Sequence, residues 1–192
     1  MGMPDLVRPW TRDEVLALPD DGNRYELIDG ILLVTPAPRP VHQLALARLY
    51  DRLRPYVALH GLGELLWSPA DLELERGYVS QPDLYVIDLD GRRPPADWSD
   101  VGVPCFVIEV LSPSTGRFDR AIKRPAYQRA GVGEYWIVDP AARLIERWQP
   151  ADQRPEVCLS RAVWCPRSDL PPFELDLEEY FAAVWGDSGL PA

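Results

Sequence analysis

The sequence predicts a mixed α/β (α+β) domain, because stretches with helical spacing alternate with apolar runs of strand length. Asp29-Gly30, between two apolar runs, is a strong hairpin signal. Residues 40–61 have the pattern of a long helix. Residues 82–88 and 105–111 are apolar almost throughout, which is typical of strands buried on both faces.

The first third of the chain places two predicted helices around the hairpin. Thr11 and Glu14 have the spacing of a capping box, which opens a short helix. The hairpin strands occupy residues 24–34. The long helix that follows ends at Gly61, and Pro55 is a candidate kink within it because proline removes a helical hydrogen bond.

The middle of the chain contains four predicted strands and a loop. Residues 63–67 form the first strand. Residues 71–75 alternate acidic and apolar side chains, which predicts a half-buried strand with one face in water. The two apolar runs form central strands. Residues 91–100, polar and rich in proline, form the loop between them.

The last third begins with a helical pattern over residues 116–131. Pro125 interrupts this pattern, so the helix either kinks there or starts afresh with Pro125 in its first turn. Further strands are predicted at residues 134–139 and 144–149, with a weak one at 157–163 and a closing helix N-capped by Asp176.

Composition and charge exclude several classes of protein. The 192 residues carry a formal net charge of −10, which argues against a surface that coats nucleic acid non-specifically, though not against a local basic patch. We see no secretion signal and no uncharged stretch of transmembrane length. The three cysteines lack the close spacing of a zinc site, and an odd number does not suggest a disulfide framework. We therefore expect one cytoplasmic domain over residues 1–192, with reduced thiols and no membrane partner.

Glu109 lies inside the apolar run 105–111, where an ionised carboxylate is costly unless it is paired or binds a metal. Asp83 begins the other central strand directly after Pro82, a residue suited to a strand's first position. Two adjacent carboxylates repel each other, and a hard cation such as Mg²⁺ removes that repulsion. For Asp83 alone a solvent-facing strand end is the simpler interpretation, but the pair favours a metal site.

Lys123 is the only lysine among 20 basic residues; the other 19 are arginine. Lysine can tune its pKa and arginine cannot, so a single retained lysine suggests a chemical role, with chance retention as the alternative. An ammonium beside a metal site can orient or deprotonate a water, or stabilise charge developing on phosphate.

Several segments, in order along the chain, resemble the Uma-two family of restriction endonuclease-like proteins, a branch of the PD-(D/E)xK nuclease superfamily. They are RYELIDG (24–30), His42-Gln43, QPDLYVID (81–88), VIEVLSPST (107–115), the Asp119-to-Lys123 spacing, and YQRAGVGEYWIVDP (127–140). The resemblance covers about residues 24–140. It implies a restriction-endonuclease-like core, a central mixed sheet flanked by helices, on which residues 141–192 pack as further strands and a helix.

The resemblance also implies a set of site residues. Asp83 and Glu109 would ligate Mg²⁺, or Mn²⁺ in its place, with the backbone carbonyl of Val110 as a further ligand. Glu26 would be an additional acid on the first core element, with an exposed strand acid as its alternative interpretation.

Two positions depart from the superfamily pattern. The third residue of the (D/E)xK triplet is Leu111, whose apolar side chain cannot replace a lysine, and Lys123 on the following helix fits that role. Cys105 stands where the family more often has an acid, and we interpret it as a packing residue. Tyr127 and Trp136 are also expected in the core.

A phosphodiester substrate needs local positive charge, which this chain concentrates between residues 117 and 129. The candidate substrate-binding residues there are Arg117, Arg120 and Arg124, with an ordinary solvated helix face as the alternative interpretation. His42 either contacts phosphate or the attacking water, or lies on a helix surface. Asp119, four residues before Lys123, either orients it or forms a surface pair.

The sequence thus predicts an Mg²⁺-dependent endodeoxyribonuclease with DNA as its substrate. Asp83 and Glu109 hold the metal, Glu26 assists, and Lys123 positions water and stabilises charge on the phosphorane-like state. A homodimer is expected by analogy, because cutting two strands needs two sites. The alternatives are a catalytically silent protein that binds nucleic acid or protein on a retained nuclease fold, and a metal-dependent hydrolase with another substrate.

Overall fold

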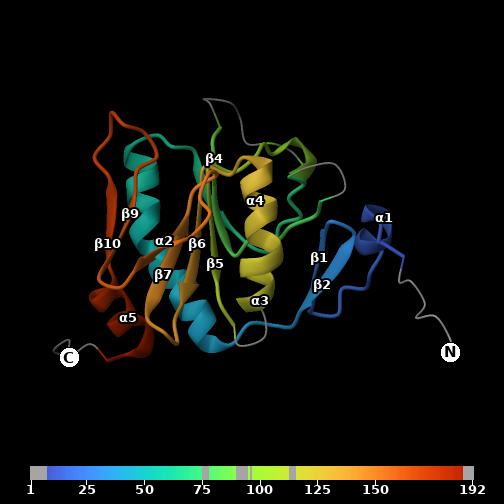
Figure 1. Cartoon of the computed structure of the whole chain (residues 1–192), viewed down its shortest axis with the longest axis horizontal. Coiled ribbons are helices and arrows are strands. Elements are labelled where there is room, and N and C mark those ends of the chain that lie inside the picture. Colours follow the sequence, from blue (N-terminus) through green and yellow to red (C-terminus); the bar gives the residue numbers. More distant parts are fainter. Residues whose placement is uncertain (1–7, 75–77, 90–94, 96, 113–115, 188–192) are drawn as a thin grey trace.

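The centre of the molecule is a six-stranded mixed sheet (Figure 1). The structure is a computed structural model that describes residues 8–74, 78–89, 95, 97–112 and 116–187. In spatial order the strands are β3 (Glu64–Trp67), β4 (Leu84–Ile87), β5 (Phe106–Val110), β6 (Glu134–Asp139), β7 (Leu144–Trp148) and β8 (Glu156–Cys158). β5 and β6 run parallel, and the other neighbouring pairs are antiparallel. The expected mixed α/β fold is confirmed.

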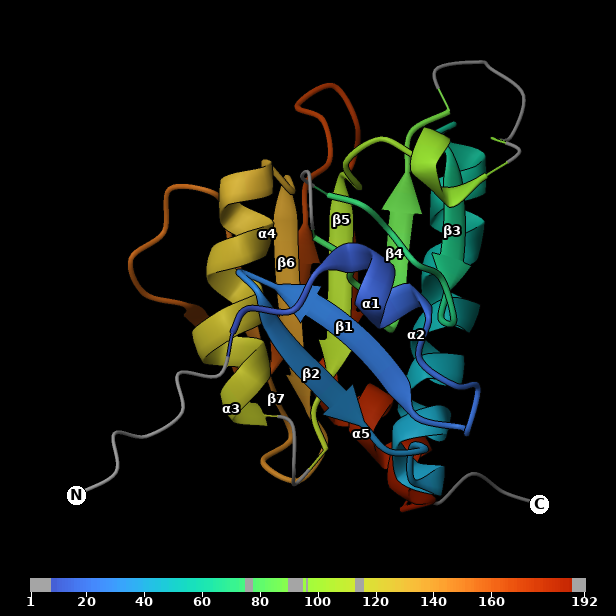
Figure 2. The ribbon, with the colours of Figure 1, turned by 90° about the vertical axis from the view of Figure 1, so that its right-hand side faces the viewer.

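Two layers cover the faces of this sheet. One consists of α2 (Pro40–Leu59), α5 (Leu177–Trp185) and a small antiparallel sheet of β9 (Arg161–Trp164) and β10 (Phe173–Asp176). The other contains α3 (Gly116–Phe118), η2 (Asp119–Lys123) and α4 (Arg124–Ala130), and the hairpin of β1 (Arg24–Ile28) and β2 (Ile31–Thr35) with α1 (Arg12–Leu16). Figure 2 shows the hairpin crossing in front of the sheet beside α4.

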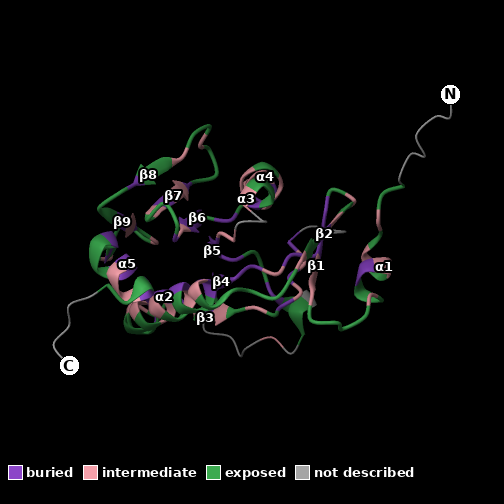
Figure 3. Cartoon of the chain, turned by 90° about the horizontal axis from the view of Figure 1, so that it is seen from below, coloured by how far each residue is buried: buried purple, intermediate pink, exposed green. Residues whose placement is uncertain are grey.

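Strand alternation divides the core into two parts. On β5, Phe106 and Ile108 pack into the cluster formed with α2 and α5, whereas Val107 packs on the opposite side with Tyr127 of α4. Every residue of β5 is buried, as expected of a strand covered on both faces (Figure 3). Alternation therefore directs Glu109 toward the α4 side.

Several predicted helix ends are present in the structure. Thr11 and Glu14 form the capping box of α1. α2 continues through Pro55 and ends in a Schellman motif, in which the N–H of Leu62 donates to the carbonyl of Val57. Gly61 supplies the left-handed conformation (φ +59°) that this motif needs.

Pro125 is the second residue of α4, but the backbone of Lys123 and Arg124 is helical, so α3, η2 and α4 follow one another without a break and the helix does not start afresh. The preceding turn, η2, is π-helical, and the N–H of Arg124 donates to the carbonyl of Asp119. Proline lacks an N–H and its ring crowds the carbonyl four residues earlier, so a wider turn just before it relieves the conflict. Lys123 lies on this wide turn.

Two strand predictions were wrong in detail. Residues 71–74 form no ladder, because Leu72 makes only an isolated bridge to Ser80, although Leu72 and Leu74 are buried as the alternation predicted. The single weak strand at 157–163 is two strands, β8 and β9, because its halves pair with different sheets.

Parts of two predictions lie outside the described residues. They are Glu75 at the end of the alternating segment and most of the loop expected at residues 91–100, whose last part forms the 3₁₀ turn η1 (Trp98–Asp100). In the portion that is described, no helix has the length and apolar character needed to cross a membrane.

Candidate active site

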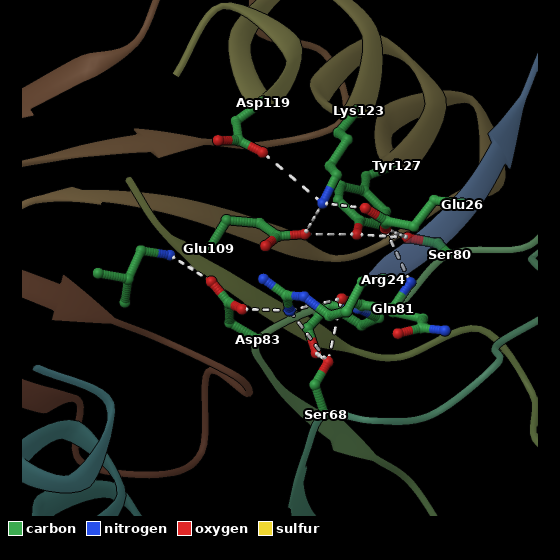
Figure 4. A network of polar contacts seen from close by, with 12 residues as sticks. Arg24, Glu26, Ser68, Ser80, Gln81, Asp83, Glu109, Asp119, Lys123 and Tyr127 are labelled. Atoms are coloured by element: carbon green, nitrogen blue, oxygen red, sulfur yellow. Dashed lines mark hydrogen bonds and ion pairs between the residues drawn. The ribbon is translucent and has the colours of Figure 1, made fainter. Parts of the chain in front are cut away.

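The register of β4 and β5 brings the two predicted metal ligands together. Leu84 pairs with Ile108, so one step further along the antiparallel ladder places Asp83 opposite Glu109. The backbone N–H of Val110 donates to Oδ2 of Asp83 at 2.9 Å. Both carboxylates are buried on the side of the sheet that α4 covers (Figure 4). The proximity inferred from the sequence is therefore present.

Lys123 reaches this pair from the π-helical turn above the sheet. Its Nζ lies 3.0 Å from Oε1 of Glu109, 2.8 Å from Oε2 of Glu26 and 3.7 Å from Oδ1 of Asp119. Asp119 is itself buried, so its pairing with Lys123 is not a surface pair. One ammonium thus bridges acids from β1, β5 and its own helix (Figure 4).

Glu26 is a buried member of this cluster and not an exposed strand acid. A two-way backbone bridge between Leu27 and Val79 fixes β1 beside the segment that leads into β4. Oε1 of Glu26 accepts hydrogen bonds from the N–H of Gln81 at 2.8 Å and the hydroxyl of Ser80 at 3.2 Å. β1 pairs with β2 and is not a strand of the six-stranded sheet, yet it places a third carboxylate, that of Glu26, beside that sheet.

Asp83 has two further partners on its outer side. Arg24 donates from its guanidinium to Oδ1 at 2.6 Å, and Nε2 of His42 lies 2.9 Å from Oδ2. His42 is buried and its Nδ1 has no hydrogen-bond partner, so it does not lie on the exposed side of α2. Both residues thus belong to the site's geometry.

The two central acids have opposite pKa shifts. Burial raises the pKa of Glu109 well above its ordinary value; the charge of Lys123 opposes this rise, and the charges of Asp83 and the other acids add to it. Burial acts on Asp83 in the same direction, but the hydrogen bond and charge of His42, with the charges of Arg24 and Lys123, outweigh it and lower the pKa. Asp83 is therefore ionised, while Glu109 tends to retain a proton.

Lys123 remains an ammonium ion in this environment. Burial alone would lower its pKa, but the charges of Glu109, Glu26 and Asp119 outweigh burial and raise it well above the ordinary value. An amine with so high a pKa stays protonated at neutral pH, so it has no lone pair with which to take a proton from water. Among the roles open to Lys123, this favours hydrogen-bond donation and charge stabilisation over deprotonation of a water.

The donor chemistry of the cluster fits a divalent cation. Four carboxylates (Glu26, Asp83, Glu109 and Asp119) face two permanent cations (Arg24 and Lys123) in this part of the described chain. Ionisation of all four would leave two negative charges uncompensated, and burial makes such charges costly, which is why Glu109 tends to keep its proton in the absence of a cation. No three Asp, Glu, His or Cys side chains among the described residues have the arrangement of a complete metal site. Mg²⁺ suits such a partial set, because it commonly binds one or two carboxylates and keeps waters or phosphate oxygens.

A cavity of about 150 Å³ lies over the cluster. Its walls include Asp83, Glu109, Val110, Asp119, Lys123, Arg24, His42 and, from the segment before α2, Arg39. All three predicted metal ligands and the predicted lysine therefore line one space. Glu26 is not among the lining residues, but it contacts Lys123 at 2.8 Å.

The three arginines suggested for substrate binding lie elsewhere on the same helical segment. Arg120 pairs with Glu146 of β7 at 2.6 Å, and the guanidinium of Arg124 lies 4.6 Å from the ring centroid of Trp148. Arg117 is exposed. None of the three is among the residues that line the cavity, so their role as substrate ligands stays a prediction.

Sequence reasoning overlooked two members of the site. Arg24 lies two residues before Glu26 on β1, so both side chains project from the same face of the strand, and strand periodicity was the available signal. Tyr127 lies in the core as predicted, and in addition its hydroxyl donates to Oε1 of Glu109 at 2.9 Å and contacts Ser80 at 2.7 Å. It follows Lys123 by four residues, the spacing of side chains on one helix face.

Comparison with known proteins bears on the fold and the family of this chain. The crystal structure of a putative nuclease belonging to DUF820 from Anabaena variabilis ATCC 29413 has a TM-score of 0.70 with this structure at 22% sequence identity, covering 92% of this chain and 99% of that one. At that identity the likeness shows the fold. No curated protein matches the sequence. The model of the Uma2 family, described as "Putative restriction endonuclease", matches residues 12–178. The chain therefore belongs to the Uma2 family.

Proposed function

We propose that this protein is an Mg²⁺-dependent endonuclease that hydrolyses phosphodiester bonds in DNA. The observation that carries the proposal is the convergence of Asp83, Glu109 and Lys123 from three elements on one cavity. Burying these charges costs free energy that an apolar core would not, so a chemical use accounts for them best. Membership of a family described as "Putative restriction endonuclease", and the fold shared with the "putative nuclease" from Anabaena variabilis, support the same reaction.

The proposed roles follow from the contacts of each residue. Asp83, Glu109 and the carbonyl of Val110 would hold Mg²⁺, or Mn²⁺, which when bound supplies Lewis-acid polarisation of the phosphate and a water of lowered pKa. Lys123 donates hydrogen bonds to a phosphate oxygen and stabilises the charge that develops there. Glu26 holds Lys123 in place through its contact of 2.8 Å. Arg24, on the cavity wall, presents a fork of donors suited to a second phosphate oxygen.

The first test measures metal binding and cleavage separately. Calorimetric titration of Mn²⁺ should give binding to the parent, a large loss in Asp83→Asn, and no change in Glu178→Gln, which alters an exposed acid on α5. Nicking of supercoiled plasmid in Mg²⁺ should follow the same pattern. Cleavage that persists in Asp83→Asn would contradict the proposal.

Cleavage of both strands of a duplex needs two such sites, so the proposal includes a homodimer. Analytical ultracentrifugation with and without a DNA duplex would measure the mass of the assembly. A mass of one chain in both conditions would limit the enzyme to one strand per encounter.

A second candidate function is binding without cleavage. Both carboxylate oxygens of Asp83 already have partners. Oδ1 accepts from Arg24 at 2.6 Å, and Oδ2 lies 2.9 Å from both Nε2 of His42 and the N–H of Val110. This acid is therefore satisfied without a metal. Calorimetric titration of DNA with and without Mn²⁺ distinguishes the two functions. DNA binding that does not need Mn²⁺, and that does not strengthen Mn²⁺ binding, would favour the catalytically silent protein.

A further inference from the structure

A second cavity, of about 750 Å³, adjoins the catalytic one. Arg24, Pro38, His42 and Asp83 line both cavities, so the two spaces share a wall at the outer side of Asp83. From that wall the second cavity extends along α2 to the end of β3. Its volume is within the range of sites that take small organic groups.

The far end of this cavity presents an aromatic ring to solvent. Trp67, the last residue of β3, is 56% exposed, although tryptophan is among the most apolar side chains. Tyr50 of α2 meets it edge to face, with ring centroids 5.0 Å apart and planes at 82°. Both rings line the cavity, so Tyr50 fixes the indole orientation and the cavity keeps an open aromatic wall.

The charge of the cavity changes along its length. Asp20 and Asp51 lie among its lining residues, and Arg24, on the shared wall, is the one permanent cation in that lining. Asp83 lies on the same wall and pairs with Arg24 at 2.6 Å, so a phosphate would be favoured there once Asp83 holds the metal proposed above, and it would be repelled from the rest. The far part suits an uncharged group that donates hydrogen bonds. Gln81, also in the lining, has a buried Oε1 without a hydrogen-bond partner, which provides an acceptor for such a donor.

An aromatic wall, acceptors and a phosphate site at one end together match one nucleotide. We propose that this cavity binds the nucleobase of an unpaired nucleotide whose phosphate lies at the catalytic cavity, with the base stacked on Trp67. A base within a duplex is stacked and paired and cannot enter such a space, so the substrate would be single-stranded DNA or DNA with an extruded base. This inference rests on the proposed nuclease function and names its substrate class.

Fluorescence anisotropy tests the inference with a fluorescein-labelled 20-nucleotide single strand and the matching duplex, in Ca²⁺ to prevent cleavage. The parent should bind the single strand more tightly than the duplex. Trp67→Leu should weaken single-strand binding about tenfold or more, the effect of losing one base–aromatic stack, and leave duplex binding nearly unchanged. Trp67→Phe, which keeps a ring, should recover most of the affinity. Trp98→Leu, at a tryptophan that is 37% exposed outside this cavity, is the matched control.

The outcomes separate this inference from the function on which it rests. Equal single-strand affinity of Trp67→Leu and the parent, in a protein that still nicks plasmid DNA, overturns the nucleobase site and leaves the nuclease in place. A parent that binds neither DNA nor metal overturns both. Equal losses in Trp67→Leu and Trp67→Phe would also count against stacking, because the ring would then be irrelevant.

Discussion

The two faces of β5 are equally buried but chemically opposite. Toward α2 and α5 the strand presents Phe106, Ile108 and Val110 to a cluster of apolar side chains. Toward α4 it presents Val107 and Glu109, and the acid belongs to a network of buried charges. Burial by itself therefore does not distinguish the stabilising face from the chemical one.

The difference lies in what each face gains from burial. Apolar surface removed from water stabilises the fold by about 25 cal/mol per Å². Carboxylates and ammonium groups lose hydration on burial, and their mutual attraction only partly repays that loss. We infer that the α2 face holds the fold together and that the α4 face is tolerated for its chemistry. Four predictions test this contrast between the two faces.

The largest effect should come from the apolar face. Phe106 is fully buried and stacks on Trp164, with ring centroids 4.4 Å apart. Phe106→Ala should lower the free energy of unfolding by about 3–5 kcal/mol, because it removes the ring's contacts and leaves a cavity. Urea denaturation measures this, and Val157→Ala, at an exposed residue of β8, should change it by less than about 0.5 kcal/mol. A small loss in Phe106→Ala would mean that this face is not the stabilising one.

The second effect concerns activity on the polar face. Lys123→Met keeps the length of the side chain but removes the ammonium, and plasmid nicking should fall about 100- to 1000-fold, as for loss of one preorganised transition-state donor. Mn²⁺ binding should persist, because Lys123 is not a proposed ligand. The matched control is Arg154→Met, at an exposed basic residue that does not line the catalytic cavity. Full activity in Lys123→Met would remove the lysine from the mechanism.

The third effect is on the pH dependence of stability in metal-free protein. The pKa of Glu109 is raised on folding, so its contribution to stability is fully present below its unfolded pKa and is lost as pH rises through the folded value. Glu109→Gln cannot ionise, so it should equal or exceed the parent in stability, by about 1 kcal/mol, with a gap that widens as pH rises. Urea denaturation in EDTA at pH 6 and pH 9 measures this gap. A gap that narrows with pH would show that the charge of Lys123 dominates over burial.

The smallest effect is on a thiol at the edge of the apolar cluster. Cys105 packs against that cluster, and burial, assisted by the charge of Asp88, raises its pKa to about 11. At pH 8 iodoacetamide should therefore alkylate the exposed Cys165 well before Cys105, because the thiolate is the reactive form. Peptide mass spectrometry resolves the two sites. Equal rates would mean that Cys105 is not the packing residue inferred from the sequence.

Local sequence rules located the central part of the site. An acid in an apolar strand is conspicuous because the cost of burying charge is a local property, and the single lysine stood out against 19 arginines. The same rules placed the hairpin at Asp29-Gly30 and the capping box at Thr11. They failed where two segments pair with different partners, as at residues 157–163, because a strand signal does not specify its neighbour.

The sequence alone was enough to predict the mixed α/β class and the two central strands, and to identify Asp83, Glu109 and Lys123 as unusual residues. The remaining contacts of the site depend on tertiary packing. Glu26 and Arg24 reach the cluster because Leu27 bridges to Val79, about fifty residues away, and His42 reaches it because α2 packs across the sheet. Periodicity is set within a few residues and can be read along the chain, whereas these contacts depend on how distant elements pack.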